Sequence, residues 1–212
     1  MEFTVQFKVR GDRYTGHYAN GMTMACSESV EKCKLIHSDE NKSVYESADG
    51  YKITCFHIKK ENAYECYTVF ENCSMSAVTL DMISSFAISG IQADTLHRAT
   101  SFWSAEGKLL SQKLTSLNME RSWSGNGIRI EKFGQLGSMP VRKWFPFAAL
   151  EDSKTGSFIG VQLYCPSSWQ IELFRFREPL TLAGGLADFD YGHWCKNIAP
   201  GEKFTTPKAV VA

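Results

Sequence analysis

The feature that most constrains the fold of this chain is a succession of short runs in which apolar and polar residues alternate, each bounded by turn-forming residues. Two clear runs are Phe158–Tyr164 and Trp169–Phe176, which are rich in aromatic and branched residues. The linker Cys165-Pro166-Ser167-Ser168 separates them. Proline presets one backbone dihedral and serine satisfies nearby backbone groups, so this linker predicts a turn between two strands.

Similar runs recur along the chain, and turn signals separate them. Short strands at this spacing predict an all-β sandwich or barrel. Because the chain has no linker and no internal repeat, we expect a single domain that spans residues 1–212. Ala105–Asn118 is ambiguous, because its leucines fall at roughly helical spacing although Gly107 lies near its start. The other strands are expected at Phe3–Val9, Val44–Tyr45, Tyr51–Ile58, Ala63–Asn72, Val78–Ile88 and Ile128–Phe133, with turns at Gly11-Asp12, Asn20-Gly21, Asp49-Gly50 and Gly125-Asn126-Gly127.

The composition of the chain limits the classes of partner that it is expected to bind. The 212 residues are 43% hydrophobic, which is enough for one sizeable core or two small ones. Lysine plus arginine balances aspartate plus glutamate at 23 each, so nothing favours nucleic acid or an anionic membrane surface. No apolar run is long enough to span a bilayer, and the first residues do not resemble a signal peptide. Seven irregularly spaced cysteines indicate reduced thiols, so we expect a cytoplasmic protein.

Motifs for metal binding and nucleophilic catalysis are missing. The chain has no Cys-x-x-Cys, and His193 and Cys195 have no ligand partners nearby in sequence. It has no Gly-x-Ser-x-Gly, and neither Ser122 nor Ser138 has an implied base. We therefore expect no metal site, no cofactor and no serine nucleophile.

Carboxylates gather near the C-terminal third. If the segment is extended, Asp188 and Asp190 share one face, with Tyr191 and His193 on the other. Two carboxylates about 5–10 Å apart are the machinery of glycosidases. The same residues also fit two other roles, as hydroxyl ligands of a sugar or as caps of a turn after Gly184-Gly185.

The five tryptophans are the other candidates for a sugar-facing surface. Most tryptophans of a β protein pack in the core with the ring N–H satisfied. Trp103 and Trp194 are flanked by serine, glycine, histidine and glutamate rather than by aliphatic residues. They are therefore the two expected to stack on a sugar.

From about Leu96 to Pro207 the chain resembles the N-terminal domain of glycoside hydrolase family 36, the bacterial α-galactosidases. Before about Thr79 only the strand pattern is similar. The segments that carry the resemblance are LHRATSFWSAEG (Leu96–Gly107), ERSW (Glu120–Trp123), FGQLGSMPV (Phe133–Val141), FPFAALED (Phe145–Asp152), SWQIEL (Ser168–Leu173), GGLADFDYGHW (Gly184–Trp194) and PGEKFTTPK (Pro200–Lys208).

The resemblance implies a β-supersandwich, two stacked antiparallel sheets like those of galactose mutarotase. It also implies that the catalytic aspartates lie on a (β/α)₈ barrel that would follow residue 212. The residues of this chain show no strand–helix alternation of the kind that builds such a barrel. No catalytic residue is therefore assigned to this chain. The substrate-binding candidates, as loops that help to close the sugar pocket, are Trp103, Asp188, Tyr191, His193 and Trp194.

The leading hypothesis is an accessory domain of an α-galactosidase that hydrolyses terminal α-galactosides such as melibiose or raffinose with retention. Its partners would be its own barrel, the galactoside and neighbouring subunits of a homo-oligomer. The alternatives are a stand-alone carbohydrate-binding module without catalysis and a purely structural part without ligand contact. A self-contained glycosidase would have to rely on Asp188 and Asp190.

Overall fold

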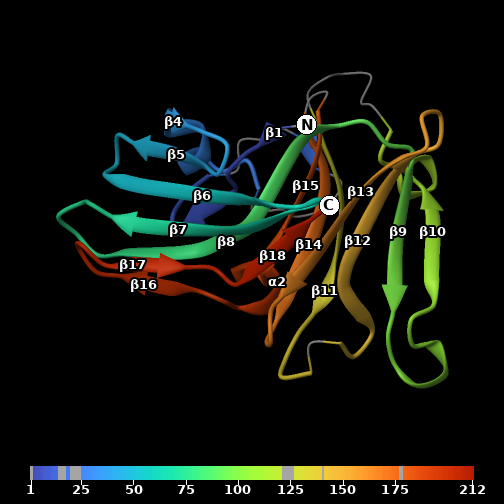
Figure 1. The fold of residues 1–212 in the computed structure, drawn as a ribbon. Helices are drawn as coiled ribbons and strands as arrows, with labels where there is room; N and C mark the ends of the chain where they lie inside the picture. The colour runs from blue at the N-terminus through green and yellow to red at the C-terminus, as the bar shows by residue number, and fades with distance from the viewer. Residues whose placement is uncertain (1, 14–17, 20–24, 121–126, 140, 177–178) are drawn as a thin grey trace.

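A computed structural model describes residues 2–13, 18–19, 25–120, 127–139, 141–176 and 179–212, and its described elements form two large sheets (Figure 1). The eight-stranded sheet has the order β1-β8-β15-β14-β11-β3, with β2 and β16 also paired to β8. Its strands are β1 (Glu2–Phe3), β2 (Phe7–Val9), β3 (Tyr18–Ala19), β8 (Val78–Ile91), β11 (Gly127–Gln135), β14 (Trp169–Phe176), β15 (Leu180–Leu186) and β16 (Lys196–Ile198).

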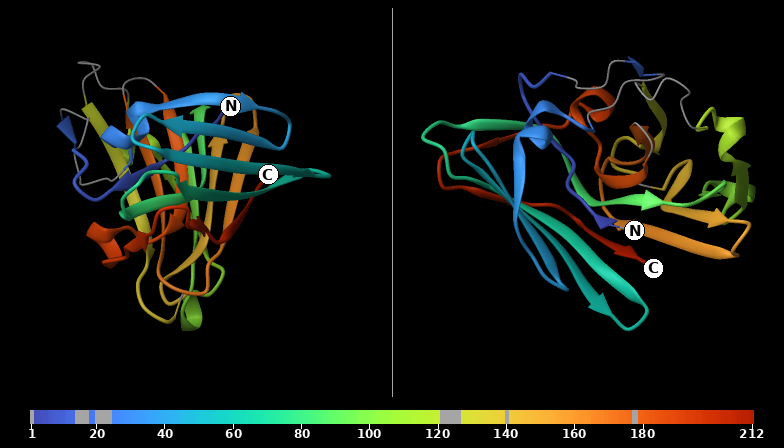
Figure 2. Two further views of the ribbon diagram at one scale, coloured as in Figure 1. Left: turned by 90° about the vertical axis from the view of Figure 1, so that its left-hand side faces the viewer. Right: turned by 90° about the horizontal axis from the view of Figure 1, so that it is seen from above.

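The second sheet has ten strands in the order β10-β9-β12-β13-β18-β7-β6-β5-β4, with β17 paired to β7. Figure 2 shows that it twists strongly, so that β4 to β7 run across the direction of β12 and β13. Its strands are β4 (Cys33–Ser38), β5 (Lys42–Ser47), β6 (Tyr51–Lys60), β7 (Ala63–Asn72), β9 (Thr95–Thr100), β10 (Leu109–Lys113), β12 (Trp144–Asp152), β13 (Ser157–Tyr164), β17 (Lys203–Thr205) and β18 (Lys208–Val211).

The prediction of an all-β sandwich of two antiparallel sheets is confirmed; the exception is the parallel pair of β3 with β11. The described helical segments are short: α1 (Glu28–Lys32), α2 (Phe189–Gly192) and the 3₁₀ turns η1 (Trp103–Ala105) and η2 (Leu114–Leu117). Several strands begin and end where the alternation predicted, β7 and β14 among them. The expected turns at Asn20-Gly21 and Gly125-Asn126-Gly127 lie wholly or mainly outside the described residues.

Two local expectations need correction. The ambiguous segment Ala105–Asn118 is mainly strand β10 followed by the turn η2, because its residues pair with the edge of β9. The extended conformation assumed for residues 188–193 is wrong. A short helix, α2, forms there, and Asp188 caps its first turn by accepting a hydrogen bond from the Tyr191 N–H.

The main core lies between the two sheets. Alternate residues of β14, such as Trp169, Ile171 and Leu173, face Leu96, Leu150 and Leu163 of the ten-stranded sheet. A second cluster joins Phe7 and Leu80 to Ile53 and Phe70 at the other end. The period of two therefore divides each strand into an inner face and an outer face.

The outer face of the eight-stranded sheet is covered by the chain itself. Phe174 and Ala183 project from it and pack with Ala25, and with Phe189 of α2. Among the described residues, no helix is long and apolar enough to cross a membrane. All seven cysteines are free thiols.

Candidate functional site

The loop between β9 and β10 carries Trp103, and it is tied down by its backbone. The Thr100 N–H donates to the Lys108 carbonyl at 2.9 Å, and the Gly107 N–H donates to the Thr100 carbonyl at 2.9 Å. The Ser101 N–H donates to the Lys143 carbonyl at 2.9 Å, which joins the loop to the start of β12. The loop is therefore a fixed support rather than a free tail, and it projects at the lower right of Figure 1, well apart from α2.

The two aromatic residues at the tip have strained backbones. Phe102 has φ 101° and Trp103 has φ 45°, a region that residues with a Cβ rarely adopt. This strain is not offset by burial of the Trp103 side chain, since the residue is 78% exposed. Strain of this kind, of about 1–3 kcal/mol for each residue, concentrates at ligand-binding sites. The tip therefore has the features of a binding element.

A groove of about 680 Å³ opens beside this tip. A volume of that size is within the range of small-molecule sites. One wall comes from the loop after β9 and the other from the loop between β11 and β12. The groove is lined by Ser101, Phe102, Trp103, Glu106, Ser138, Met139, Val141 and Arg142. Its aromatic and aliphatic groups can meet the C–H face of a sugar, and its two charged residues can bond to hydroxyls.

Among the five predicted site residues, only Trp103 lies on this groove. Sequence reasoning did not select its other lining residues. A signal for them was present, because LHRATSFWSAEG and FGQLGSMPV, two of the segments that carry the family resemblance, supply most of the lining on opposite walls.

The other four predicted residues lie in α2 or next to its two ends. Asp188 is completely buried, and its carboxylate is fully engaged. One oxygen accepts from Lys132 Nζ at 2.6 Å and from Gln170 Nε2 at 3.0 Å, and the other accepts from the Tyr191 N–H at 2.7 Å. The carboxylate therefore links the helix to the sheet beneath it.

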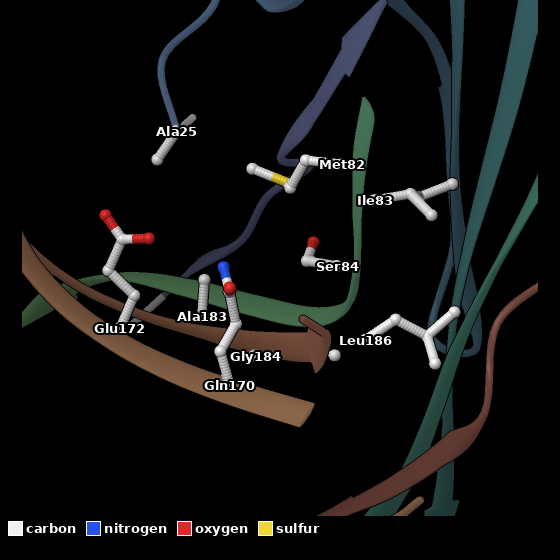
Figure 3. A pocket seen from close by; sticks show the side chains of 10 residues that line it. Ala25, Met82, Ile83, Ser84, Gln170, Glu172, Ala183, Gly184 and Leu186 are labelled. Atoms are coloured by element: carbon white, nitrogen blue, oxygen red, sulfur yellow. The ribbon is translucent and has the colours of Figure 1, made fainter. Parts of the chain in front are cut away.

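Glu172 completes this buried charged cluster on the outer face of the eight-stranded sheet. Its carboxylate lies 3.5 Å from Lys132 Nζ. The pKa of Glu172 is raised to about 7, mainly by burial and also by the nearby Asp188, although Lys132 opposes the shift. Burial would lower the pKa of Lys132, but the two carboxylates outweigh it and keep that pKa above its usual value. Figure 3 shows Gln170 and Glu172 projecting toward Ala25, Met82 and Ser84.

The space beside this cluster is too small for a sugar. Its volume is about 10 Å³, which is room for one water molecule at most. It is lined by Ala25, Met82, Ile83, Ser84, Gln170, Glu172, Ala183, Gly184, Gly185 and Leu186. The cluster therefore has the structure of a support for α2 rather than of a sugar pocket.

Tyr191 belongs to the same helix, and His193 and Trp194 follow its last residue. Tyr191 is half-buried, and burial raises the pKa of its phenol. His193 ends the helix with φ 55° and is exposed. The Trp194 ring packs 5.5 Å from the Phe204 ring against the second core cluster. In the described part of the chain, His, Cys, Asp and Glu do not gather in threes at distances that would hold a metal ion.

Comparison with known proteins gives a fold match by structure alone. No protein-family model matches the chain, and no curated protein matches it by sequence. The galactosidase domain of an α-galactosidase–sucrose kinase superposes with a TM-score of 0.67 at 12% identity, covering 100% of this chain and 30% of that one. The α-galactosidase from Lactobacillus brevis gives 0.65 at 13%, covering 98% and 27%.

A third solved structure, the GH36 α-galactosidase AgaA from Geobacillus stearothermophilus, gives a TM-score of 0.64 at 18% identity and covers 99% of this chain and 29% of that one. The chain thus spans less than a third of the length of these enzymes. Its fold is that of the N-terminal domain of GH36 α-galactosidases, as the resemblance predicted.

Proposed function

We propose that this chain is the N-terminal accessory domain of a cytoplasmic α-galactosidase of glycoside hydrolase family 36, and that it forms one domain over residues 1–212. The observation that carries the proposal is the fold match over 98–100% of this chain to α-galactosidases, of which it covers 27–30%. The whole chain shares its fold with one part of a larger enzyme. This favours an accessory role for the chain within an enzyme of that kind.

The chemistry would belong to a barrel that follows residue 212. In retaining hydrolysis, one carboxylate attacks the anomeric carbon, and the other protonates the leaving oxygen and then activates water. This chain supplies neither group in the proposal. The Asp188 carboxylate accepts hydrogen bonds on both oxygens and lies 2.6 Å from a lysine ammonium, which argues against a catalytic role.

The Trp103 groove would form a wall of the sugar pocket. The exposed indole and the neighbouring Phe102 ring, 6.0 Å away, offer apolar faces to the C–H side of galactose. AgaA has been crystallised as variants in complex with stachyose and with raffinose, two candidate substrates of the parent enzyme. The proposal also includes contacts between this domain and neighbouring subunits of a homo-oligomer.

The test compares this chain with the full product of its gene on a chromogenic α-galactoside. We expect turnover by the longer protein only. In the longer protein, Trp103→Ala should raise KM with a smaller change in kcat, because an exposed stacking residue binds ground state and transition state alike. Turnover by the 212-residue chain would contradict the proposal, and Asp188 and Asp190 would then be the first residues to substitute.

A stand-alone carbohydrate-binding module is the second candidate, and the 78% exposure of Trp103 beside a groove favours it. Calorimetric titration of the 212-residue chain with galactose and melibiose separates the two functions. Saturable binding that Trp103→Ala abolishes would favour the module. Unchanged kinetics of the longer enzyme after Trp103→Ala and after Trp194→Ala would favour a purely structural role.

A further inference from the structure

The outer side of the ten-stranded sheet carries an aromatic surface that the proposed sugar groove does not use. The register of the strands places its residues on one face: Glu151 pairs with Phe158, Tyr164 with Lys208, and Phe56 with Tyr67. We name this surface the outer aromatic face. It comprises Phe56, Ile58, Tyr67, Phe147, Ala149, Phe158, Tyr164 and Val210.

Most of these side chains are accessible to solvent. Phe158 and Tyr164 are each 58% exposed, and the others are half-buried by their neighbours in the sheet. The rings are already arranged, because Phe56 stacks on Tyr67 with centroids 4.6 Å apart and planes at 14°. An ordered surface of rings loses little side-chain entropy when a partner covers it.

Two groups of polar side chains on the same face are paired within the sheet. The His97 ring bonds to Ser111 Oγ at 2.8 Å and to Glu151 Oε2 at 3.0 Å. Lys208 Nζ donates to Glu65 at 3.0 Å and lies 5.8 Å from the centroid of the Tyr67 ring. A partner could therefore cover the face without leaving these groups unpaired, which would otherwise cost about 1–3 kcal/mol for each.

The two sheets differ in what covers them. The eight-stranded sheet has α2 and the segment around Ala25 on its outer side. The described elements that pack on the ten-stranded sheet are mainly strands of the other sheet, among them β8, β11 and β14, and the core they share lies on the inner side. An antiparallel sheet with one face in water normally shows polar residues there, and extended apolar patches on soluble proteins mark interaction surfaces.

We propose that the outer aromatic face is the docking surface for the catalytic domain of the same polypeptide, which would cover it with the apolar sides of helices from its outer ring. This inference rests on the proposed function. The matched α-galactosidases have about 70% of their length outside the region that this chain covers, so a partner large enough for a face five strands wide is available in such an enzyme. Interfaces between domains of one chain bury about 600–1,500 Å².

The position of the face also connects it to the groove. His97 of β9 and Ser111 of β10 lie on this side of the sheet, and the loop that joins these two strands carries Trp103 (Figure 1). A domain seated on the outer aromatic face would therefore border the Trp103 loop. Docking would hold the exposed indole at a fixed distance from the catalytic domain.

Hydroxyl-radical footprinting tests the proposal with the 212-residue chain and the full product of its gene. Phe158 and Tyr164 should be oxidised in the short chain and protected several-fold in the longer protein. Met75, which is 95% exposed between β7 and β8, is the internal control and should be oxidised equally in both. Equal oxidation of Phe158 and Tyr164 in the two proteins would overturn the proposal.

A paired substitution gives the second measurement. Phe158→Lys with Tyr164→Lys should leave the Tm of the 212-residue chain nearly unchanged, and in the longer protein it should split one unfolding transition into two. Met75→Lys should change neither. Concentration-dependent protection in the short chain would identify a second copy as the occupant and overturn the assignment to the catalytic domain. Protection in a longer protein without α-galactosidase activity would instead refute the proposed function and retain the docking surface.

Discussion

The Trp103 loop and the Asp188–Trp194 segment look alike in sequence and differ in the structure. Each combines an indole with glycine, carboxylate and hydroxyl neighbours. Trp103 stands in solvent on a strained backbone, whereas Asp188 and Trp194 are held by a buried ion pair and a ring contact. The comparison shows that the same residue types can build an exposed loop tip or a helix support, depending on what lies beneath them.

The largest expected effect on stability comes from the buried ion pair of Asp188 and Lys132, which supports α2. Asp188→Ala would leave Lys132 buried with only Glu172 as its carboxylate partner and would remove the cap of α2. Removing one partner of a buried pair costs about 3–5 kcal/mol. We expect a loss of that size in the free energy of unfolding, measured by urea denaturation.

The matched control is Asp190→Ala, because Asp190 is an exposed carboxylate of the same helix. Its expected cost is below about 1 kcal/mol. Adding Lys132→Met to Asp188→Ala should recover part of the loss, since the buried ammonium that lost its 2.6 Å partner is then gone. Equal effects of the two aspartate substitutions would show that the ion pair does not support the helix.

Glu172 provides the next effect, as a dependence of stability on pH. Its pKa is about 7 in the folded protein and 4.5 ordinarily, so the folded state binds the proton more tightly. The resulting stabilisation is full below pH 4.5 and is lost as the pH rises through 7. Its size is on the order of 3 kcal/mol.

The measurement is the difference in unfolding free energy between the wild type and Glu172→Gln at pH 5 and at pH 8. This difference cancels the titration of groups that both proteins share, and it should become less favourable to the wild type at pH 8. A difference that does not change with pH would show that Glu172 titrates normally.

The two tryptophans give a direct comparison of the regions. Trp194→Ala removes a half-buried ring that packs on Phe204 and the second core cluster, and we expect a cost of about 2 kcal/mol, below the 3–5 kcal/mol of a fully buried ring. Trp103→Ala should change stability by less than about 0.5 kcal/mol, because the side chain is exposed. Thermal unfolding of both variants checks this, and similar losses would contradict the assignment of separate roles.

The sequence predicted the strands well because period-two alternation reports directly which side chains are buried. β7 and β14 follow from alternation and flanking turns alone. The helix α2 was missed because four helical residues are too few for a helical period to appear, and the cap at Asp188 depends on a lysine 56 residues away in sequence. The groove was found only through Trp103, because its second wall comes from another loop, and the pairing of β9 with β12 in the ten-stranded sheet brings the two loops together.

The smallest expected effect tests whether the backbone at the tip of the Trp103 loop is strained. At most positions glycine is less stable than alanine by about 0.5–1 kcal/mol, because the unfolded chain gains freedom. Phe102 has φ 101°, where alanine keeps the clash of its Cβ and glycine does not. Phe102→Gly should therefore be more stable than Phe102→Ala by about 1 kcal/mol in urea denaturation. Both variants lose the ring, so their difference isolates the backbone. The usual order, with alanine the more stable, would mean that the tip is relaxed and that only exposure separates Trp103 from Trp194.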